Sequence, residues 1–291
     1  MSKQATRAFE ALRPDLLSLA YRMLGDVGRA QDLVQEAWLR WHQNTAPVDS
    51  PRAFLITVVT RLCLNELGSA RARREESRVQ LPEPVADEVI GARDAEQISM
   101  AFLVLLERLS PPERAVVLLH DVFDYSHDEV AALLQRTPAA SRKLLERAKA
   151  KLASGRKLAA TTRDEHERLL RAFQQAAFAG DVTAMTTLLA DDATLFADAG
   201  SDDRVVNGVR AIREPLVGAA AIAEFVQRAS RASRPSHIRQ QDLNGRPALV
   251  FSRDGAVFGA LLVEIAGGKI RSLYFQADAA RLRFVSGGAS A

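Results

Sequence analysis

The sequence predicts a multidomain protein in which two all-α helical domains precede an α+β domain. Three observations indicate this order. Apolar residues recur every three or four positions through about residue 155, the spacing of amphipathic helices. That periodicity is lost over residues 75–95, where Leu81-Pro82-Glu83-Pro84 cannot be helical in its middle. After about residue 160, helical stretches alternate with strand-like runs, which Asp254-Gly255 and Gly267-Gly268 separate as hairpin turns do.

Composition and length exclude several classes of protein. The chain has 291 residues, 47% of them hydrophobic, and a formal net charge of +3. This apolar fraction excludes wholesale disorder, and no segment has the roughly 18 uninterrupted apolar residues of a membrane span. The first seven residues lack the apolar stretch of a signal peptide, and the single Cys63 cannot close an internal disulfide. Since the five histidines show no metal-ligand spacing either, we expect a cytoplasmic protein without cofactor or metal.

Residues 1–78 are predicted to form the first helical domain, with three helices. Gly25-Asp26 ends the first helix. The second, about Gly28–Gln43, carries apolar residues on one side, and Trp41 is expected among them in the core. Ser50-Pro51 supplies an N-cap and a first-turn proline for the third helix.

Residues 96–157 are predicted to form a second helical domain that ends in a helix-turn-helix. Ser110-Pro111-Pro112-Glu113 is a capping box, and Ser126 with Glu129 forms another at the start of His127–Gln135. After a very short turn, Thr137-Pro138 begins a third helix. Short capped helices joined in this way fit a helix-turn-helix, although the pattern also fits other small helical bundles.

The charge distribution favours DNA binding by that last helix. Residues 79–135 hold three basic and 11 acidic side chains, whereas residues 136–157 hold eight basic and one acidic. The helix is expected to expose one basic stripe with flanking cations: Lys143, Arg147 and Lys151, with Arg142 and Lys149 beside them. Cations at a helix C-terminus complement the macrodipole, but Arg142 and Lys143 stand near the N-terminus, where positive charge is unfavourable. Basic residues there are typical of helices that contact bases and phosphates in the major groove.

Several separated motifs lie in order over residues 5–155: Gly28-Arg29-Ala30-Gln31-Asp32-Leu33-Val34-Gln35-Glu36-Ala37-Trp38, Ser50-Pro51-Arg52-Ala53-Phe54-Leu55, Leu109-Ser110-Pro111-Pro112-Glu113-Arg114, Tyr125-Ser126-His127-Asp128-Glu129-Val130-Ala131 and Thr137-Pro138-Ala139-Ala140-Ser141-Arg142. In this order and spacing they resemble the motifs of bacterial sigma factors of the extracytoplasmic-function (ECF) group. The resemblance implies that residues 1–78 are sigma region 2 and that residues 96–157 are region 4, with its helix-turn-helix.

The resemblance also implies partners and contact residues. Core RNA polymerase would be bound at its β′ clamp helices by the second helix, through Asp32, Leu33, Gln35, Glu36 and Trp38. The promoter −10 element would be melted and read through Arg61, Asn65, Arg71, Arg73 and Arg74. The −35 element would be read through Thr137, Pro138, Ser141, Arg142, Lys143 and Arg147.

The last part of the chain, residues 163–285, resembles a SnoaL-like domain of the cystatin-like cone fold, which a subgroup of these sigma factors carries. The linker over residues 79–95 includes Leu81, Pro82, Glu83 and Pro84, which are similar to that subgroup's linker motif and imply an interdomain contact. Asp198-Ala199-Gly200-Ser201 and Ala277-Asp278-Ala279-Ala280-Arg281-Leu282 occupy the places of two further family motifs.

Three hypotheses follow from these patterns. The first is a sigma factor whose C-terminal domain modulates it, by packing on the other domains or by sensing an unidentified small-molecule ligand. The second makes the C-terminal domain a ligand-binding or isomerase-type enzyme fused to a DNA-binding module, for which Asp198, His166 and His237 are the candidate acid–base groups. The third, a dimeric repressor, leaves residues 1–78 without a role. We favour the sigma factor, which is not an enzyme.

Overall fold

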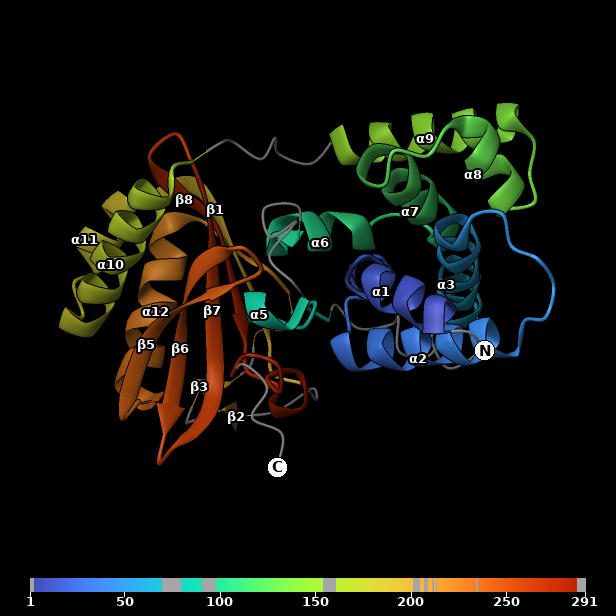
Figure 1. The fold of residues 1–291 in the computed structure, drawn as a ribbon. Helices are drawn as coiled ribbons and strands as arrows, with labels where there is room; N and C mark the ends of the chain where they lie inside the picture. Colours follow the sequence, from blue (N-terminus) through green and yellow to red (C-terminus); the bar gives the residue numbers. More distant parts are fainter. Residues whose placement is uncertain are drawn as a thin grey trace. The chain divides into compact units, whose positions relative to one another are not determined.

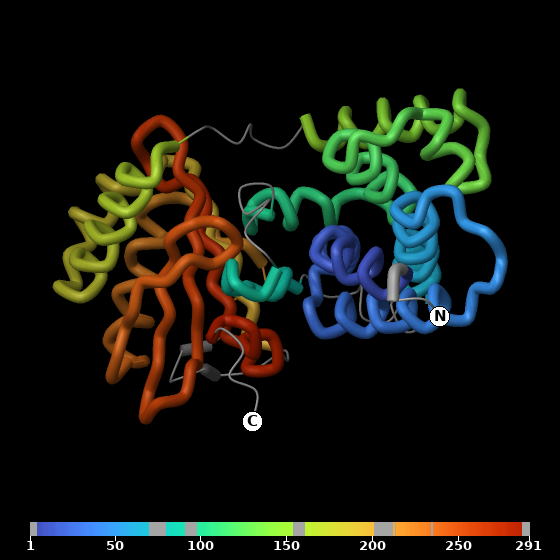
Figure 2. Tube along the Cα trace, viewed as in Figure 1, coloured from blue at the N-terminus to red at the C-terminus, as the bar shows by residue number. Residues whose placement is uncertain are grey.

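The structure is a computed structural model that describes residues 3–69, 80–90, 98–153, 161–200, 205–206, 209–210, 212, 214–233 and 235–286. The chain forms two compact units (Figures 1 and 2). The helical unit comprises Met1–Arg78 and Leu103–Lys157, and the C-terminal unit comprises Val79–Phe102 and Leu158–Ala291. No described helix is long and apolar enough to cross a membrane.

The first three helices of the helical unit are those that the sequence predicts. They are α1 (Lys3–Leu24), α2 (Val27–Gln43) and α3 (Pro51–Leu67). Gly25 follows α1 with a φ of 67°, a left-handed conformation that glycine adopts without steric cost. The Ser50 hydroxyl accepts a hydrogen bond from the Ala53 amide, which caps α3 as predicted. The three helices bury a shared apolar core: Leu16, Leu19, Val34, Ala37, Leu55 and Val59.

The helix-turn-helix is also confirmed. After α6 (Met100–Glu107) come α7 (Pro111–Val117), a π-helical turn (Leu118–Val122), α8 (His127–Leu133) and α9 (Pro138–Ala153). The Ser126 hydroxyl accepts from the Glu129 main-chain amide at 3.3 Å, and the Glu129 carboxylate accepts from the Ser126 main-chain amide at 2.8 Å, as a capping box requires. Gln135, with a φ of 54°, makes the sharp turn between α8 and α9.

A buried arginine joins the two helical domains inside the helical unit. Arg114 of α7 is 8% exposed, and its Nη1 donates to the main-chain oxygen of Met23 at the end of α1, 2.5 Å away. Its Nε donates to the main-chain oxygen of Leu106 at 3.0 Å. Carbonyl oxygens at helix C-termini lack partners within the helix, so a guanidinium is well suited to bind them.

The C-terminal unit contains a six-stranded sheet with three helices on one face (Figure 1). The strand order is β4 (Leu216–Val217), β1 (Leu189–Asp198), β8 (Lys269–Gln276), β7 (Ala256–Ala266), β6 (Arg246–Arg253) and β5 (His237–Leu243). A separate pair joins β2 (Val205–Val206) and β3 (Val209–Arg210). The helices are α10 (Arg163–Ala179), α11 (Val182–Leu188) and α12 (Ala219–Ser233).

This unit confirms the predicted α+β architecture and adds to it. Strands β5 to β8 are antiparallel, and Figure 2 shows the chain passing back and forth through them. Asp254 and Gly255, and then Gly267 and Gly268, all have positive φ in the predicted hairpin turns. Strand β1 pairs in parallel with β8, which the sequence did not indicate, and edge strand β5 was not predicted.

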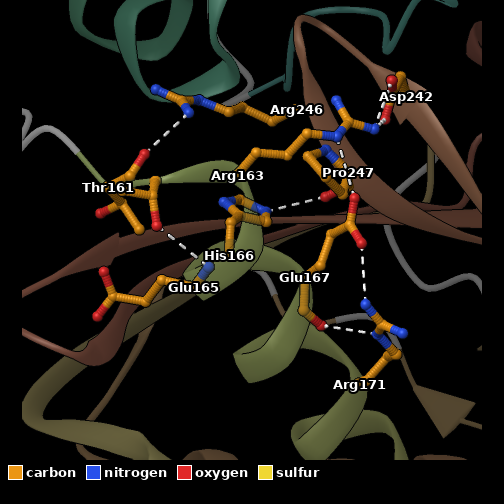
Figure 3. A network of polar contacts seen from close by, with 10 residues as sticks. Thr161, Arg163, Glu165, His166, Glu167, Arg171, Asp242, Arg246 and Pro247 are labelled. Atoms are coloured by element: carbon orange, nitrogen blue, oxygen red, sulfur yellow. Dashed lines mark hydrogen bonds and ion pairs between the residues drawn. The ribbon is translucent and has the colours of Figure 1, made fainter.

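Polar contacts attach the start of α10 to the edge of the sheet (Figure 3). The Thr162 hydroxyl caps the helix by accepting from the Glu165 amide at 3.3 Å. The Nη2 of Arg163 donates to both carboxylate oxygens of Asp242 of β5, at 2.7 and 2.8 Å. His166 is buried, and its Nε2 lies 2.9 Å from the main-chain oxygen of Pro247. Burial lowers the pKa of His166, which favours the neutral imidazole.

The segment expected as a linker belongs to the C-terminal unit. Two hydrogen bonds join Val85 and Asn244. The main-chain amide of Asn244 donates to the Val85 carbonyl, and the main-chain amide of Val85 donates to Asn244 Oδ1. Ala86 bridges to Leu243, and the short helix α5 (Asp87–Ile90) follows. The predicted linker of residues 79–95 therefore includes a folded segment, because its main-chain groups are paired with the C-terminal strands.

Candidate nucleic-acid and polymerase interface

The outer face of α2 carries the residues expected to bind polymerase. Asp26 caps the helix, and its Oδ1 accepts from the Arg29 amide at 2.8 Å. Asp32 and Gln35 are exposed, whereas the partly exposed Glu36 accepts a hydrogen bond from Arg40 at 2.5 Å. Polar groups one turn apart on one face can meet a partner surface together.

Aromatic side chains fix the orientation of this face. Trp38 is half-buried and packs on Phe9, with the ring centroids 4.8 Å apart. Trp41 is 8% exposed, and its indole nitrogen donates to the main-chain oxygen of Ala5 at 3.0 Å. Trp41 is therefore a core residue, as predicted, and Trp38 keeps part of its ring accessible.

Leu39 on α2 is a candidate that the sequence analysis did not identify. Its side chain is 50% exposed, one of the few large hydrophobic side chains so exposed among the described residues. It follows Asp32, Gln35 and Glu36 at helical spacing, so the four side chains form one stripe. Leu33, by contrast, is half-buried. The sequence signal that could have identified Leu39 is its helical spacing from Asp32 and Glu36, which places it on the polar side of α2.

Helix α3 exposes two of the residues expected at the −10 element. Arg61 and Asn65 are exposed and one helical turn apart. The Nε of Arg61 donates to the main-chain oxygen of Leu133, 3.4 Å away. Glu66 forms an ion pair with Arg29 of α2, which leaves this acid engaged beside the expected DNA-binding face. Arg71, Arg73 and Arg74 lie outside the described residues.

Helix α9 presents most of the residues expected at the −35 element. The Thr137 hydroxyl caps the helix by accepting from the Ala140 amide at 3.2 Å, and Pro138 is its first residue. Arg142, Lys143 and Arg147 are exposed. Among the described residues, no acidic side chain pairs with Arg142 or Lys143.

Ser141 departs from the expectation. Its side chain is fully buried, and its hydroxyl lies 3.2 Å from Nδ1 of His127 on α8. The residue therefore fixes α9 against α8 and does not face outward. Helical spacing alone placed Ser141 beside the contact residues, and the partner that draws it inward is 14 residues away.

The later cations of α9 are exposed, as the stripe requires, but they also pair with acidic side chains of the helical unit. Lys151 donates to Glu113 at 2.7 Å, and the Nε of Arg147 lies 4.0 Å from the same carboxylate. Lys149 pairs with Asp121 at 3.1 Å. Burial would raise the pKa of Glu113, but hydrogen bonds from Lys151 and Ser110 lower it to about 2. The free positive charge of α9 is thus concentrated near its start, at Arg142 and Lys143.

The residues of the linker motif are all buried in the C-terminal unit: Leu81, Pro82, Glu83 and Pro84. The Leu81 amide donates to Asp198 Oδ2 at 3.0 Å. Arg281 donates to the Leu81 carbonyl at 2.8 Å and to Gln80 at 2.7 Å. Asp198 and Arg281 lie in the two stretches that replace family motifs, so those stretches bind the linker segment despite their altered sequences.

Asp198 is also the carboxylate that the enzyme hypothesis requires. Besides Leu81, it accepts from the Gly200 amide at 2.9 Å and from Gln276 at 3.3 Å. A carboxylate held by three structural donors is poorly placed to act as a general base. His166 is buried at the start of α10, and His237 is exposed. Neither histidine lines the apolar cavity that the C-terminal unit forms between its helices and its sheet. The described residues also contain no cluster of His, Cys, Asp and Glu that could hold a metal ion.

The geometry defines a class of protein in which two helical domains, the second with a basic helix-turn-helix, precede an α+β domain. Residues 8–73 match the family model of sigma-70 region 2, and residues 99–152 match that of sigma-70 region 4. The chain belongs to the ECF RNA polymerase sigma factors. Its C-terminal unit has the SnoaL-like architecture that the sequence predicted.

Two relatives from Mycobacterium tuberculosis support this assignment. The ECF RNA polymerase sigma factor SigJ is 40% identical over 213 residues, which are 70% of this chain and 68% of that protein. The probable ECF RNA polymerase sigma factor SigI is 30% identical over 276 residues, 92% and 91% of the two chains. The crystal structure of SigJ matches with a TM-score of 0.75 at 29% identity, covering 95% of this chain and 97% of that one.

Proposed function

We propose that this chain binds core RNA polymerase, recognises promoter −10 and −35 elements, and initiates transcription under the influence of its C-terminal unit. The observation that carries the proposal is the exposed pair Arg142 and Lys143 at the start of α9. Both lie in the residues that match sigma-70 region 4. Their position at the start of a capped helix suits contacts with phosphates and base edges in the major groove.

The polymerase contact is assigned to α2. Its stripe of Asp32, Gln35, Glu36 and Leu39 combines exposed polar groups with an exposed apolar side chain, next to the partly accessible Trp38. Protein interfaces commonly join an aromatic or aliphatic anchor to a polar rim. The proposed partner surface is the pair of β′ clamp helices.

The −10 contact is assigned to α3 and the residues after it. Arg61 and Asn65 lie on the exposed face of α3 within the region-2 match. A guanidinium and a carboxamide can bind phosphates and the edges of unstacked bases. Arg71, Arg73 and Arg74 stay predictions.

The modulating role of the C-terminal unit is supported by the path of the linker segment. Leu81, Val85 and Ala86 each donate a main-chain hydrogen bond to a residue beyond position 197: Asp198, Asn244 and Phe284. The segment that connects region 2 to region 4 is therefore held by the C-terminal unit. A change in that unit would alter the freedom of the connection between the two promoter-binding domains.

Transcription in vitro tests the proposal. The full chain is added to bacterial core RNA polymerase on a library of genomic DNA fragments, and transcripts are mapped by their 5′ ends. We expect recurrent start sites preceded by a shared pair of sequence elements. Arg142→Ala should reduce these transcripts about tenfold, a loss of about 1.4 kcal/mol in promoter binding. Arg168→Ala, which removes an equally exposed cation from the C-terminal unit, should have no effect.

Two results would contradict the proposal. Core polymerase that starts no new transcripts with the full chain would exclude the sigma-factor role. Tight binding to duplex DNA without binding to core polymerase would favour a repressor instead.

A further inference from the structure

The C-terminal unit contains an apolar cavity, open to solvent on one side, between its helices and its sheet. The cavity has a volume of about 680 Å³ and is lined by parts of α10, α12 and five strands. Cavities that bind small molecules usually measure roughly 300 to 1,000 Å³ and are mostly apolar. Half of the chain's 12 phenylalanines line it: Phe173, Phe178, Phe225, Phe251, Phe258 and Phe275.

The charged groups of the lining differ in their availability. Asp198 is buried and already accepts hydrogen bonds from Leu81, Gly200 and Gln276. Arg231 is exposed near the end of α12, and no acidic side chain among the described residues pairs with it. Among the described residues of the lining, the one charge available to a ligand is therefore positive.

Arg231 lies where α10 and α12 end beside each other. A Cβ atom placed on Gly180, just after α10, would be 3.8 Å from Nη2 of Arg231. Gln227 of α12 donates to the Gly180 carbonyl at 2.7 Å, which ties the two helix ends together. Phe178, also part of the lining, is 62% exposed at this place. An exposed aromatic ring beside a cation is suited to an amphipathic molecule, since burial of the ring would be favourable.

We propose that this cavity binds an apolar carboxylic acid of fatty-acid size, with its hydrocarbon body among the phenylalanines and its carboxylate at Arg231. The six rings provide the dispersion contacts and the apolar surface that a hydrocarbon body needs. The guanidinium can bind a carboxylate with two parallel hydrogen bonds. A cationic ligand would be repelled by Arg231, and a neutral one would leave it without a partner.

Direct binding to the full chain tests this site without polymerase or DNA. The probe is cis-parinaric acid, a C18 carboxylic acid whose fluorescence rises in apolar surroundings. We expect saturable binding of one molecule per chain and competition by palmitate. The methyl ester, which lacks the charge, should bind about tenfold more weakly.

Paired variants of α12 distinguish the site from non-specific adsorption. Arg231→Ala should weaken binding of the acid about tenfold and leave binding of the ester unchanged. Arg228→Ala, an equally exposed arginine outside the lining, should change neither. Ala229→Phe should abolish binding because Ala229 lines the cavity, whereas Ala232→Phe on the exposed side of the helix should preserve it.

Three outcomes would overturn the proposal. They are no saturable binding to the full chain, equal affinity for acid and ester, and equal effects of Arg231→Ala and Arg228→Ala. Since binding is measured without transcription, such results would leave the proposed sigma-factor role untouched.

Discussion

Arg61 and Leu133 are 72 positions apart in the chain, and the Nε of Arg61 donates to the main-chain oxygen of Leu133 across 3.4 Å. Arg61 belongs to the face assigned to the −10 element, and Leu133 ends α8 of the helix-turn-helix. A second contact lies nearby, since the guanidinium of Arg52 lies over the Tyr125 ring, 5.3 Å from its centroid. In this structure, the face of α3 assigned to the −10 element is thus partly covered by the domain assigned to the −35 element.

Arg61→Ala is expected to reduce promoter opening while leaving stability almost unchanged. The lost hydrogen bond is long, at 3.4 Å, so it contributes little to folding, whereas a phosphate contact would be lost in the open complex. Permanganate reactivity of unpaired thymines around the −10 element measures the opening, and urea unfolding measures stability. Arg13→Ala on α1 is the matched control, and equal reactivity in both variants would contradict the assignment.

Leu39→Asn is expected to weaken binding to core polymerase about tenfold without changing the unfolding midpoint. Leu39 is half exposed, so the free protein gains little from its side chain, but an interface would bury it. Affinity can be measured by fluorescence anisotropy of the labelled full chain with core polymerase. Val217→Asn removes another exposed apolar side chain and should leave affinity as it is.

Glu113→Gln should lower the free energy of unfolding of the helical unit by about 2 kcal/mol at pH 7. The carboxylate caps α7 through Ser110 and binds Lys151, and both interactions need the charge.

The same residue predicts a pH dependence. Because the pKa of Glu113 is lowered to about 2, its stabilisation is present above its ordinary pKa of 4.5 and is lost as the pH falls toward 2. Between pH 5 and pH 2.5, the free energy of unfolding measured in urea should therefore fall less in Glu113→Gln than in the unsubstituted protein. Equal declines in both proteins would show that Glu113 does not carry this stability.

Glu264→Gln should raise stability at pH 8 by about 2 kcal/mol and have little effect at pH 4. Burial on β7 raises the pKa of Glu264 to about 7, despite the opposing charge of Arg246. The native state therefore binds this proton more tightly than the unfolded state does, and stability falls as the pH rises from 4.5 through 7. The exposed Glu224 provides the control through Glu224→Gln, for which no such gain is expected.

Asp198→Asn should destabilise the C-terminal unit by about 1 to 3 kcal/mol. Leu81 and Gln276 donate to Oδ2 of Asp198, and Gly200 donates to Oδ1. Asparagine keeps only one acceptor oxygen, so at least one of these donors loses its partner. Residues 80–90 should then become accessible to proteases, which limited proteolysis with mass spectrometry can detect. Asp254→Asn alters an exposed hairpin turn and should leave the cleavage pattern unchanged. Unchanged cleavage in Asp198→Asn would show that this carboxylate does not hold the segment.

The helices and most strands could be predicted because local signals and the tertiary fold agree. Ser110, Ser126 and Thr137 each begin a helix where their side chains suggested a cap, since capping depends only on residues within one turn. Strand β5 was missed because only Ile238 and Leu243 are apolar in it, and its hydrogen bonds to β6 define it instead.

The candidate site was predictable as positions on helices but not as directions of side chains. Ser141 and Arg142 are neighbours in sequence, yet one is buried against His127 and the other is exposed. The engagement of Lys151 by Glu113 joins residues 38 positions apart, which no local pattern reveals. Leu39 illustrates the reverse case, because its helical spacing from Asp32 and Glu36 already indicates the exposed direction that the structure shows.

The contacts of the linker segment have a consequence for biosynthesis. Leu81 forms hydrogen bonds with Asp198 and Arg281, which follow it by 117 and 200 positions. Val85 forms one with Asn244, which follows it by 159 positions. A ribosome therefore completes sigma regions 2 and 4 before it makes the partners of the segment that connects them. During that interval the nascent chain is a sigma unit with an untethered connection, and it reaches its final form only when the strands and the last turn have been translated.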